Sequence, residues 1–313
     1  MRTTRIGLAV GCAALLLTGC SSSDAGPDDR ARSEEAPPVD FRTPPAVSAT
    51  PSMRASTSLE LPLEAYQWTD DEERTRRQGE DLLAAECMRG FGFDLEPRPP
   101  YRGDKALRDA NRYGVTNLDT ASRFGYRIDP ADRGPRPPEE NYSPAESLVL
   151  FGLPDGQDSS RTADGKSVPQ GGCWGKALRD LAAQGPKVHP DKEEFASQLA
   201  VFTYQESQKD SRVKQAFAKW SDCMKGKGYT YKGPMDPVED PSFKDSTSAS
   251  RREIQVAEAD VECKREHNVI GVWYAVEVAY QERAIEQNQQ QLDTLKQRKE
   301  AVLKAAARAG ATR

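Results

Sequence analysis

Hydrophobic residues along this chain recur at the three- and four-residue spacing of helices, and the alternation typical of strands is absent throughout. Several of these periodic stretches begin with a helix-capping residue and end at glycine or proline. The pattern therefore predicts an all-α protein. The expected helices cover 70–89, two short segments that end near 111 and 124, 144–151, 173–183, a segment after Pro190, a segment that begins at Asp210 or Ser211 and reaches Cys223, a segment that follows Ser250, and a final segment that reaches about Ala307.

A short motif, which we call the Cys-Met motif, occurs twice and closes a predicted helix each time. It occupies 86–93 and 222–229 and has the order acid, Cys, Met, base, Gly, any residue, Gly, aromatic. A glycine just past a helix adopts the left-handed conformation at low cost, and the aromatic side chain can cover the helix end. Each copy is followed by another cysteine on a later helix. We interpret the motif as a disulfide-stapled helix terminus, with a ligand-binding loop as the alternative.

The first twenty residues are typical of an export signal. Arg2 and Arg5 give a positive start, residues 6–17 form an apolar run, and the segment closes at Cys20. The run is too short to span a bilayer permanently. Residues 17–20 resemble a bacterial lipobox, which implies that a lipoprotein signal peptidase removes 1–19 and that the Cys20 thiol carries a diacylglyceryl group. The alternative is a plain secretory signal with an incidental cysteine.

The remainder of the chain divides by composition into a polar part and a helical part. Residues 20–57 are rich in Ser, Asp, Glu and Pro and poor in large apolar side chains, so we expect a disordered tether. A first helical half then covers 58–188, and a second covers 189–313 and includes the long final helix. Whether the two halves form one domain stays open at this point. No segment after the signal approaches eighteen apolar residues, so no second membrane span is predicted.

The cysteines indicate two disulfides. Cys12 leaves with the signal and Cys20 carries the lipid, and the four that remain are Cys87, Cys173, Cys223 and Cys263. An even number of cysteines on an exported chain is typical of disulfides, whereas a four-thiolate zinc site would favour Cys-x-x-Cys pairs, which this sequence lacks. Four cysteines allow three pairings. We predict Cys87–Cys173 and Cys223–Cys263, because this pairing keeps each bridge within its half of the chain.

The final helix has two interpretations. Residues 270–280 are nearly all apolar and therefore buried, and a seven-residue apolar seam continues beyond them, broken by Asn288 and Lys299. The seam consists of Ile285, Leu292, Leu295 and Val302. The helix either packs along its own domain or projects as a coiled coil that pairs with a membrane or cell-wall protein. A basic group near its end suits the helix dipole and could also contact anionic lipid or wall phosphates: Lys296, Arg298, Lys299, Lys304 and Arg308.

Charge and motif content narrow the classes of function. The net charge is -5, so the chain has no electrostatic footprint for nucleic acid. The two histidines are His189 and His267, and the sequence has no His-Glu-x-x-His or Gly-x-Ser-x-Gly motif. The loop that holds Asp155, Asp158 and Asp164 does not have the spacing of a calcium-binding hand. We therefore assign no catalytic, cofactor-binding or metal-ligating residue.

Taken together, the lipobox, the two Cys-Met motifs and the segments 171–175, 259–264 and 272–277 resemble uncharacterised actinobacterial lipoproteins of the Streptomyces type. The resemblance covers nearly everything after the tether and implies an α-rich, disulfide-bonded protein at the outer face of the cell membrane. It implies no activity and no cofactor.

From these observations we expect a lipid-anchored envelope protein with a non-catalytic binding or scaffolding role. One alternative is a solute-binding or sensing lipoprotein that delivers a ligand to a membrane complex. That version requires a pocket lined by aromatic residues such as Tyr113, Phe124, Trp174 and Trp273. The other alternative is an envelope hydrolase, which requires a cleft with two close carboxylates whose pKa values are perturbed.

Overall fold

Helices form where the capping residues and the apolar spacing predict them, and the regular secondary structure of the described residues is helical apart from one small hairpin. The side chains of Thr69, Ser143 and Ser250 each accept a hydrogen bond from the third helical residue, whose glutamate bonds back to the cap. The elements are η1 (Pro62–Tyr66), α1 (Asp70–Arg89), α2 (Lys105–Asn111), α3 (Leu118–Phe124), η2 (Pro130–Asp132), α4 (Pro144–Phe151), β1 (Thr162–Ala163), β2 (Lys166–Ser167), α5 (Gly172–Ala182), α6 (Phe195–Lys209), α7 (Ser211–Gly226), η4 (Asp236–Glu239), η5 (Pro241–Phe243), α8 (Arg251–Glu266) and α9 (Val269–Ala311).

The computed structural model describes residues 39–96, 98, 103–132, 141–153, 162–163, 165–189, 192–243 and 248–311. The predicted signal peptide, Cys20, the first part of the tether and the loop aspartates Asp155, Asp158 and Asp164 lie outside the described residues. Contacts group Pro37–Arg313 into one unit, so the two predicted halves pack together as one body.

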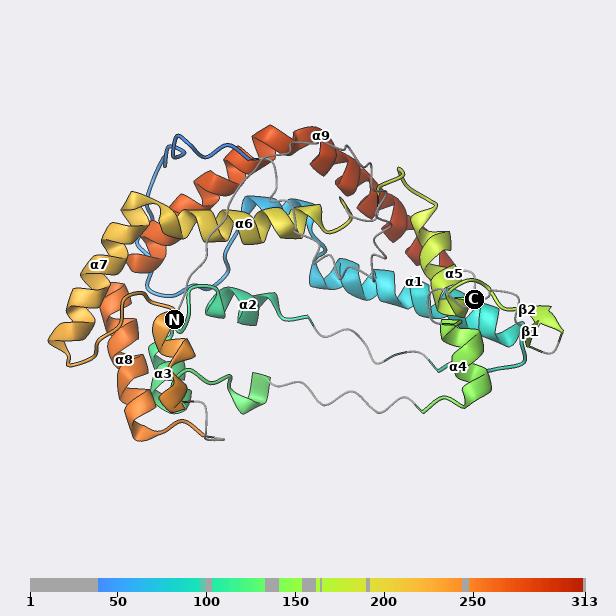
Figure 1. Ribbon diagram of the computed structural model, residues 1–313, viewed down its shortest axis with the longest axis horizontal. Coiled ribbons are helices and arrows are strands. Elements are labelled where there is room, and N and C mark those ends of the chain that lie inside the picture. The colour runs from blue at the N-terminus through green and yellow to red at the C-terminus, as the bar shows by residue number, and fades with distance from the viewer. Residues whose placement is uncertain are drawn as a thin grey trace, which may run out of the picture. The chain divides into compact units, whose positions relative to one another are not determined.

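The long helix α9 is the element on which the other longer helices assemble (Figure 1). It contacts α1, α5, α6, α7, α8 and η1. Near its start, the Trp273 ring is fully buried and lies 4.8 Å from the Tyr113 ring, and its indole N–H donates to Ser207 Oγ at 3.0 Å. Farther on, Asn288 leaves helical geometry and marks a kink, where its amide donates to the Ala284 carbonyl at 2.9 Å. Both predicted halves therefore build on this one helix.

The predicted seam of α9 lies inside the fold. Leu292 and Leu295 are buried with Phe195 and Leu199 of α6, and Val302 is buried with Leu181 of α5. The helix packs along its own domain, as the first of the two interpretations predicts. Because the chain's own helices cover these side chains, the seam is not available for a coiled coil with a partner.

The two disulfides have the predicted pairing. Cys87–Cys173 joins α1 to α5 with a Cα–Cα distance of 5.5 Å, and Cys223–Cys263 joins α7 to α8 with a distance of 5.8 Å. Both distances fall in the usual range for disulfides.

The two copies of the Cys-Met motif build the same helix end. Gly92 and Gly228 have φ values of 84° and 89°, which glycine adopts without strain. The following residue, Phe93 or Tyr229, donates its backbone N–H to the carbonyl of the motif methionine at 3.1 and 2.9 Å, respectively. The sequence repeat is therefore a structural repeat, as predicted.

The ordered part of the chain begins earlier than the predicted boundary at residue 58. Residues 39–57 form no helix but lie against the helical core. The Phe41 ring contacts the rings of Phe202 and Tyr280 with centroid distances of 5.8 and 4.6 Å. Asn268 accepts a hydrogen bond from the backbone of Met53 at 2.9 Å. The expectation of a tether over 20–57 is therefore wrong for 39–57, because a few isolated apolar side chains hold this proline-rich segment in place.

A substitution in 39–57 tests whether this segment is packed on the core or is a free tether. We expect Phe41→Ala to lower the free energy of unfolding by about 1–3 kcal/mol through lost aromatic burial. Arg42→Ala is the matched control, because the Arg42 side chain is 91% exposed and pairs only with the neighbouring Asp40 in the described chain. Chemical denaturation monitored by circular dichroism measures both. Equal stability of the two variants would contradict the packing described here.

The closest approach of α1 and α9 depends on a glycine. A Cβ atom added at Gly79 would lie 2.5 Å from Ala306 Cβ and 2.6 Å from Ala306 Cα. We therefore expect Gly79→Ala to destabilise the fold by about 1–3 kcal/mol, although alanine is the better helix former. Gly226→Ala is the control, since nothing lies within 4 Å of a Cβ there, and it should change stability by less than about 1 kcal/mol. Thermal unfolding reports the difference, and a stabilised Gly79→Ala variant would disprove the contact.

Candidate functional site

A cleft of about 570 Å³ lies where α1, α5 and α9 meet, and the segments that precede α1 and α6 complete its edge. This volume falls within the usual range of small-molecule sites. One side of the cleft is ionic and another is apolar. The lining residues are Tyr66, Trp68, Glu73, Arg76, Glu80, Leu178, Arg179, Leu181, Ala182, Glu193, Glu194, Leu295, Arg298, Lys299 and Val302.

The ionic wall is a row of charged side chains on one face of α1. Arg76 donates to Glu73, with Nη2 and Oε1 2.6 Å apart, and to Glu80, which also accepts from Arg98 at 3.0 Å. Spacings of three and four residues bring these side chains together on a helix. Burial alone would raise the pKa of Glu73, but the hydrogen bonds and charges of Arg76 and Arg77 outweigh it and lower the pKa. The carboxylates of this wall are therefore paired with arginines of the chain itself.

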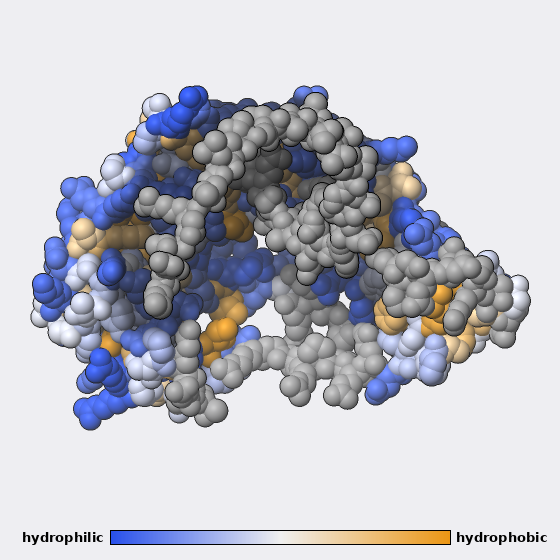
Figure 2. Space-filling model, in the orientation of Figure 1, coloured by the Kyte–Doolittle hydropathy of each residue, from blue (hydrophilic) through white to orange (hydrophobic). Residues whose placement is uncertain are grey.

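The apolar wall comes from α5 and α9. Leu181, Leu295 and Val302 are buried beneath the cleft. Two large apolar side chains remain partly open to solvent at its edge, Trp68 at 38% and Leu178 at 39% exposure. Most of the coloured surface in Figure 2 is hydrophilic, and the hydrophobic residues gather in patches. A cleft that combines buried leucines with a partly exposed tryptophan therefore suits an apolar ligand group.

Hydrogen bonds to α9 hold the other edges of the cleft. Arg298 donates to Glu193 Oε1 at 2.7 Å and to the Pro186 carbonyl at 3.0 Å. Lys299, almost fully buried, donates to Glu72 Oε2 at 3.0 Å. Sequence reasoning assigned both cations to a basic group near the helix end. In the structure they bind the segments that precede α6 and begin α1, so they position the walls of the cleft.

The Cys87–Cys173 disulfide fixes two of these walls relative to each other, because it joins the end of α1 to the start of α5. The other disulfide, Cys223–Cys263, joins α7 to α8, and neither of those helices lines the cleft. Of the two predicted disulfides, only Cys87–Cys173 therefore joins helices that line the cleft.

Sequence reasoning did not identify the cleft. Trp68, Arg76 and Leu178 are far apart in the chain, and no motif connects them. The spacing of Glu73, Arg76 and Glu80 predicts a charged face on a helix. Such faces are usually solvated, so the spacing alone does not indicate a binding site. Only the packing of α5 and α9 beside that face turns it into the wall of a cleft.

The aromatic residues named for a solute pocket do not line this cleft. Tyr113 and Trp273 fill the core, and Phe124 is half-buried beneath Arg123. Trp174 lines a separate, smaller pocket of about 250 Å³, where the guanidinium of Arg98 lies 3.9 Å from its ring centroid. A cation of the chain itself therefore covers that ring.

The most deeply buried ions belong to the core rather than to a site. Lys264 and Asp260 are fully buried, and Lys264 Nζ donates to Asp260 Oδ2 at 2.9 Å. Trp220 donates to the other carboxylate oxygen at 2.9 Å. Burial raises the pKa of Asp260, and the charge of Lys264 opposes that shift. These partners satisfy both carboxylate oxygens, so the cluster joins α7 to α8 and leaves no free group for chemistry.

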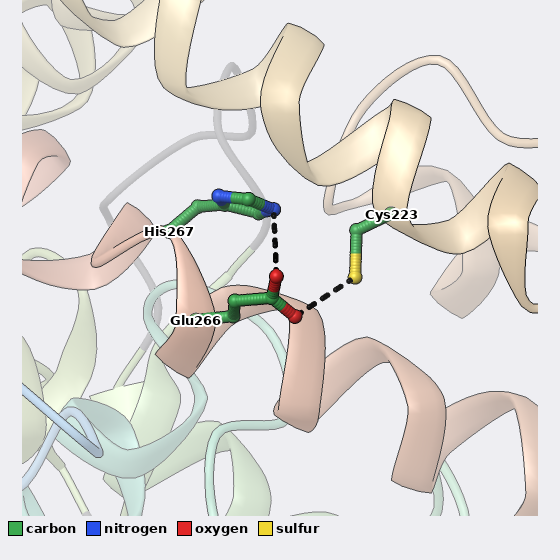
Figure 3. A group of neighbouring side chains, drawn as sticks. All are labelled: Cys223, Glu266 and His267. Carbon is green, nitrogen blue, oxygen red and sulfur yellow. Dashed lines mark hydrogen bonds and ion pairs between the residues drawn. The ribbon is translucent and has the colours of Figure 1, made fainter.

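One group in the described part of the chain has the residue types of a metal site: Cys223, Glu266 and His267 (Figure 3). Glu266 lies between the other two, 3.7 Å from Cys223 Sγ and 3.9 Å from His267 Nε2. Cys223 is bridged to Cys263, so its sulfur is not a thiolate. Because zinc sites use deprotonated cysteine, the remaining carboxylate and imidazole do not form a complete ligand set.

No protein-family model, curated protein or solved structure matches this chain. The resemblance to actinobacterial lipoproteins therefore stays a prediction. None of the helices in the described ranges has the length and apolarity needed to cross a membrane.

Because Cys223 is bridged to Cys263, we predict that the group of Cys223, Glu266 and His267 does not bind zinc. We expect an excess of Zn²⁺ to leave the melting temperature of the oxidised protein unchanged, because no thiolate is present at this group. Differential scanning calorimetry with Zn²⁺ and with a chelator measures this. A stabilisation that disappears in His267→Ala but persists in the control His189→Ala would show that the group binds zinc without its cysteine.

Proposed function

We propose that this chain is a lipid-anchored, extracytoplasmic protein of the cell envelope with a non-catalytic binding role. Its contact with the membrane is the lipid on Cys20, at the outer face. Two or three acyl chains on one residue anchor a protein stably where one chain does not. The observation that carries the binding role is the cleft between α1, α5 and α9, whose walls the Cys87–Cys173 disulfide holds together.

The disulfides support the proposed location. Disulfides form and persist in oxidising compartments and are rare in the cytosol. Here each bridge joins the cysteine of one Cys-Met motif, at the end of a helix, to a cysteine on a later helix. This repeated arrangement favours a structural role over a transient redox role. Paired cysteines and an N-terminal lipobox are two independent features that favour the same compartment.

A scaffolding role through the C-terminal helix has less support. The apolar seam of α9 is covered by the chain's own helices. Lys296, Glu300 and Lys304 are exposed at four-residue spacing and alternate in charge, which is typical of a solvated helix face. A protein partner in the membrane or wall would therefore contact a surface other than the seam.

A hydrolase is the other alternative, and the cleft does not favour it. A general acid requires a raised pKa, whereas the pKa of Glu73 is lowered by its arginine partners after burial has raised it. The neighbouring Glu80 accepts from both Arg76 and Arg98. These carboxylates form ion pairs with arginines of the chain itself, which suits a binding surface.

Lipid attachment tests the proposal directly. In cells grown with an alkyne-bearing palmitate, we expect the wild-type protein to carry the label and the Cys20→Ala variant to carry none. Cys12→Ala is the matched control, because the signal peptidase removes that residue, and it should label normally. External protease should also digest the protein on intact spheroplasts. An unlabelled wild-type protein, or one that only cell lysis exposes to protease, would overturn the proposal.

A further inference from the structure

We propose that the cleft between α1, α5 and α9 binds a short apolar peptide with free termini. Its amino group pairs with Glu194, its carboxylate pairs with Arg179, and its apolar side chains lie on the leucine wall. This inference rests on the proposed binding function and adds the ligand class.

The charges at the cleft divide into two groups. Arg76, Arg298 and Lys299 each form ion pairs or hydrogen bonds with the walls. By contrast, Arg179 and Glu194 are exposed, and neither makes a hydrogen bond or ion pair with another side chain in the described part of the chain. They lie on different segments, Arg179 in α5 and Glu194 just before α6. The cleft therefore offers one cation and one anion that form no hydrogen bond or ion pair with the described residues of its own walls.

Among the carboxylates that line the cleft, Glu194 is the one without a hydrogen-bonded cation in the described part of the chain. The carboxylates of Glu73, Glu80 and Glu194 all act on the guanidinium of Arg76 and raise its pKa against the effect of burial. Glu73 and Glu80 already bond Arg76, so Glu194 is the carboxylate with capacity for a further donor. A primary ammonium, with its three N–H donors, matches this position.

The cleft also presents apolar side chains. Leu178 and Trp68 are among the few large hydrophobic side chains of the described chain that are substantially exposed, and both line this cleft. Exposed apolar surface in a concave site is typical of ligand binding. An apolar body with opposite charges at its two ends fits this arrangement, and a peptide of leucine-type residues has that chemistry. An extended residue spans about 3.3–3.6 Å. The length of the tightest-binding peptide therefore reports the distance between Arg179 and Glu194.

The experiment uses isothermal titration calorimetry on the full mature protein with leucine peptides of about two to five residues, a range that suits a site of this size. The tightest-binding peptide is then compared with its N-acetylated and its C-amidated forms. Each cap removes one charge, so we expect each to weaken binding by about tenfold, as for a loss of one ion pair. Binding that is equally tight with both caps would overturn the proposal, as would no binding of any of the free peptides.

Two variants assign the charges to residues. In Arg179→Gln, amidation should weaken binding no further, while acetylation still does. In Glu194→Gln the pattern should reverse. Lys176→Gln on α5 and Glu206→Gln on α6 are matched controls outside the cleft and should keep both preferences. If each variant retains the cap preference that it should lose, the peptide binds elsewhere and the assignment is wrong.

The outcome is separate from that of the proposed function. Lipid labelling at Cys20 with no peptide binding would disprove the proposed ligand class and leave the envelope role standing. Peptide binding by a protein that is unlabelled and cytoplasmic would remove the envelope role and leave the cleft as a peptide site.

Discussion

Burial of α9 is the constraint on which the rest of the structure depends. This helix supplies core residues to both predicted halves and contacts α1 and α5 as well as α6, α7 and α8. At Gly79 and Ala306 the backbones of α1 and α9 approach so closely that one methyl group would not fit. The cleft is a consequence of this packing, because α1, α5 and α9 each supply one part of its wall.

Buried charge restricts how α9 can dock. Glu277 is fully buried on this helix, and its carboxylate accepts hydrogen bonds from Arg112 and from the Tyr113 hydroxyl, the latter at 2.7 Å. Removing a partner from such a group is costly, since it leaves an uncompensated buried charge. The observed register brings residues 112–113 beside Glu277, and Gln281 on α9 itself donates to the same carboxylate at 3.1 Å. The polar cluster therefore selects one alignment among those that apolar contacts alone would allow.

Local structure could be predicted from the sequence because it depends on neighbours in the chain. Capping boxes at Thr69, Ser143 and Ser250 defined helix starts, and the Cys-Met motif defined two helix ends. The disulfide pairing was predicted by keeping each bridge within its half of the chain, and the structure has that pairing. The packed segment 39–57 was missed, because Phe41 and Met53 are isolated apolar residues among prolines and polar residues. The orientation of the α9 seam stayed open, because an apolar seam has the same spacing whether the chain's own helices or a partner covers it. The cleft could not be predicted at all, since its lining residues come from distant segments.

The central claim is that the Cys87–Cys173 disulfide and the docking of α9 hold the cleft in one shape. Hydrogen exchange by mass spectrometry, on two double variants, tests this most directly. In Cys87→Ser/Cys173→Ser, the account predicts faster exchange in α5 and in the last turns of α1, with unchanged protection in α7 and α8. Cys223→Ser/Cys263→Ser should show the opposite distribution. Unchanged protection of α5 without its disulfide would contradict the claim that this bridge holds the cleft wall.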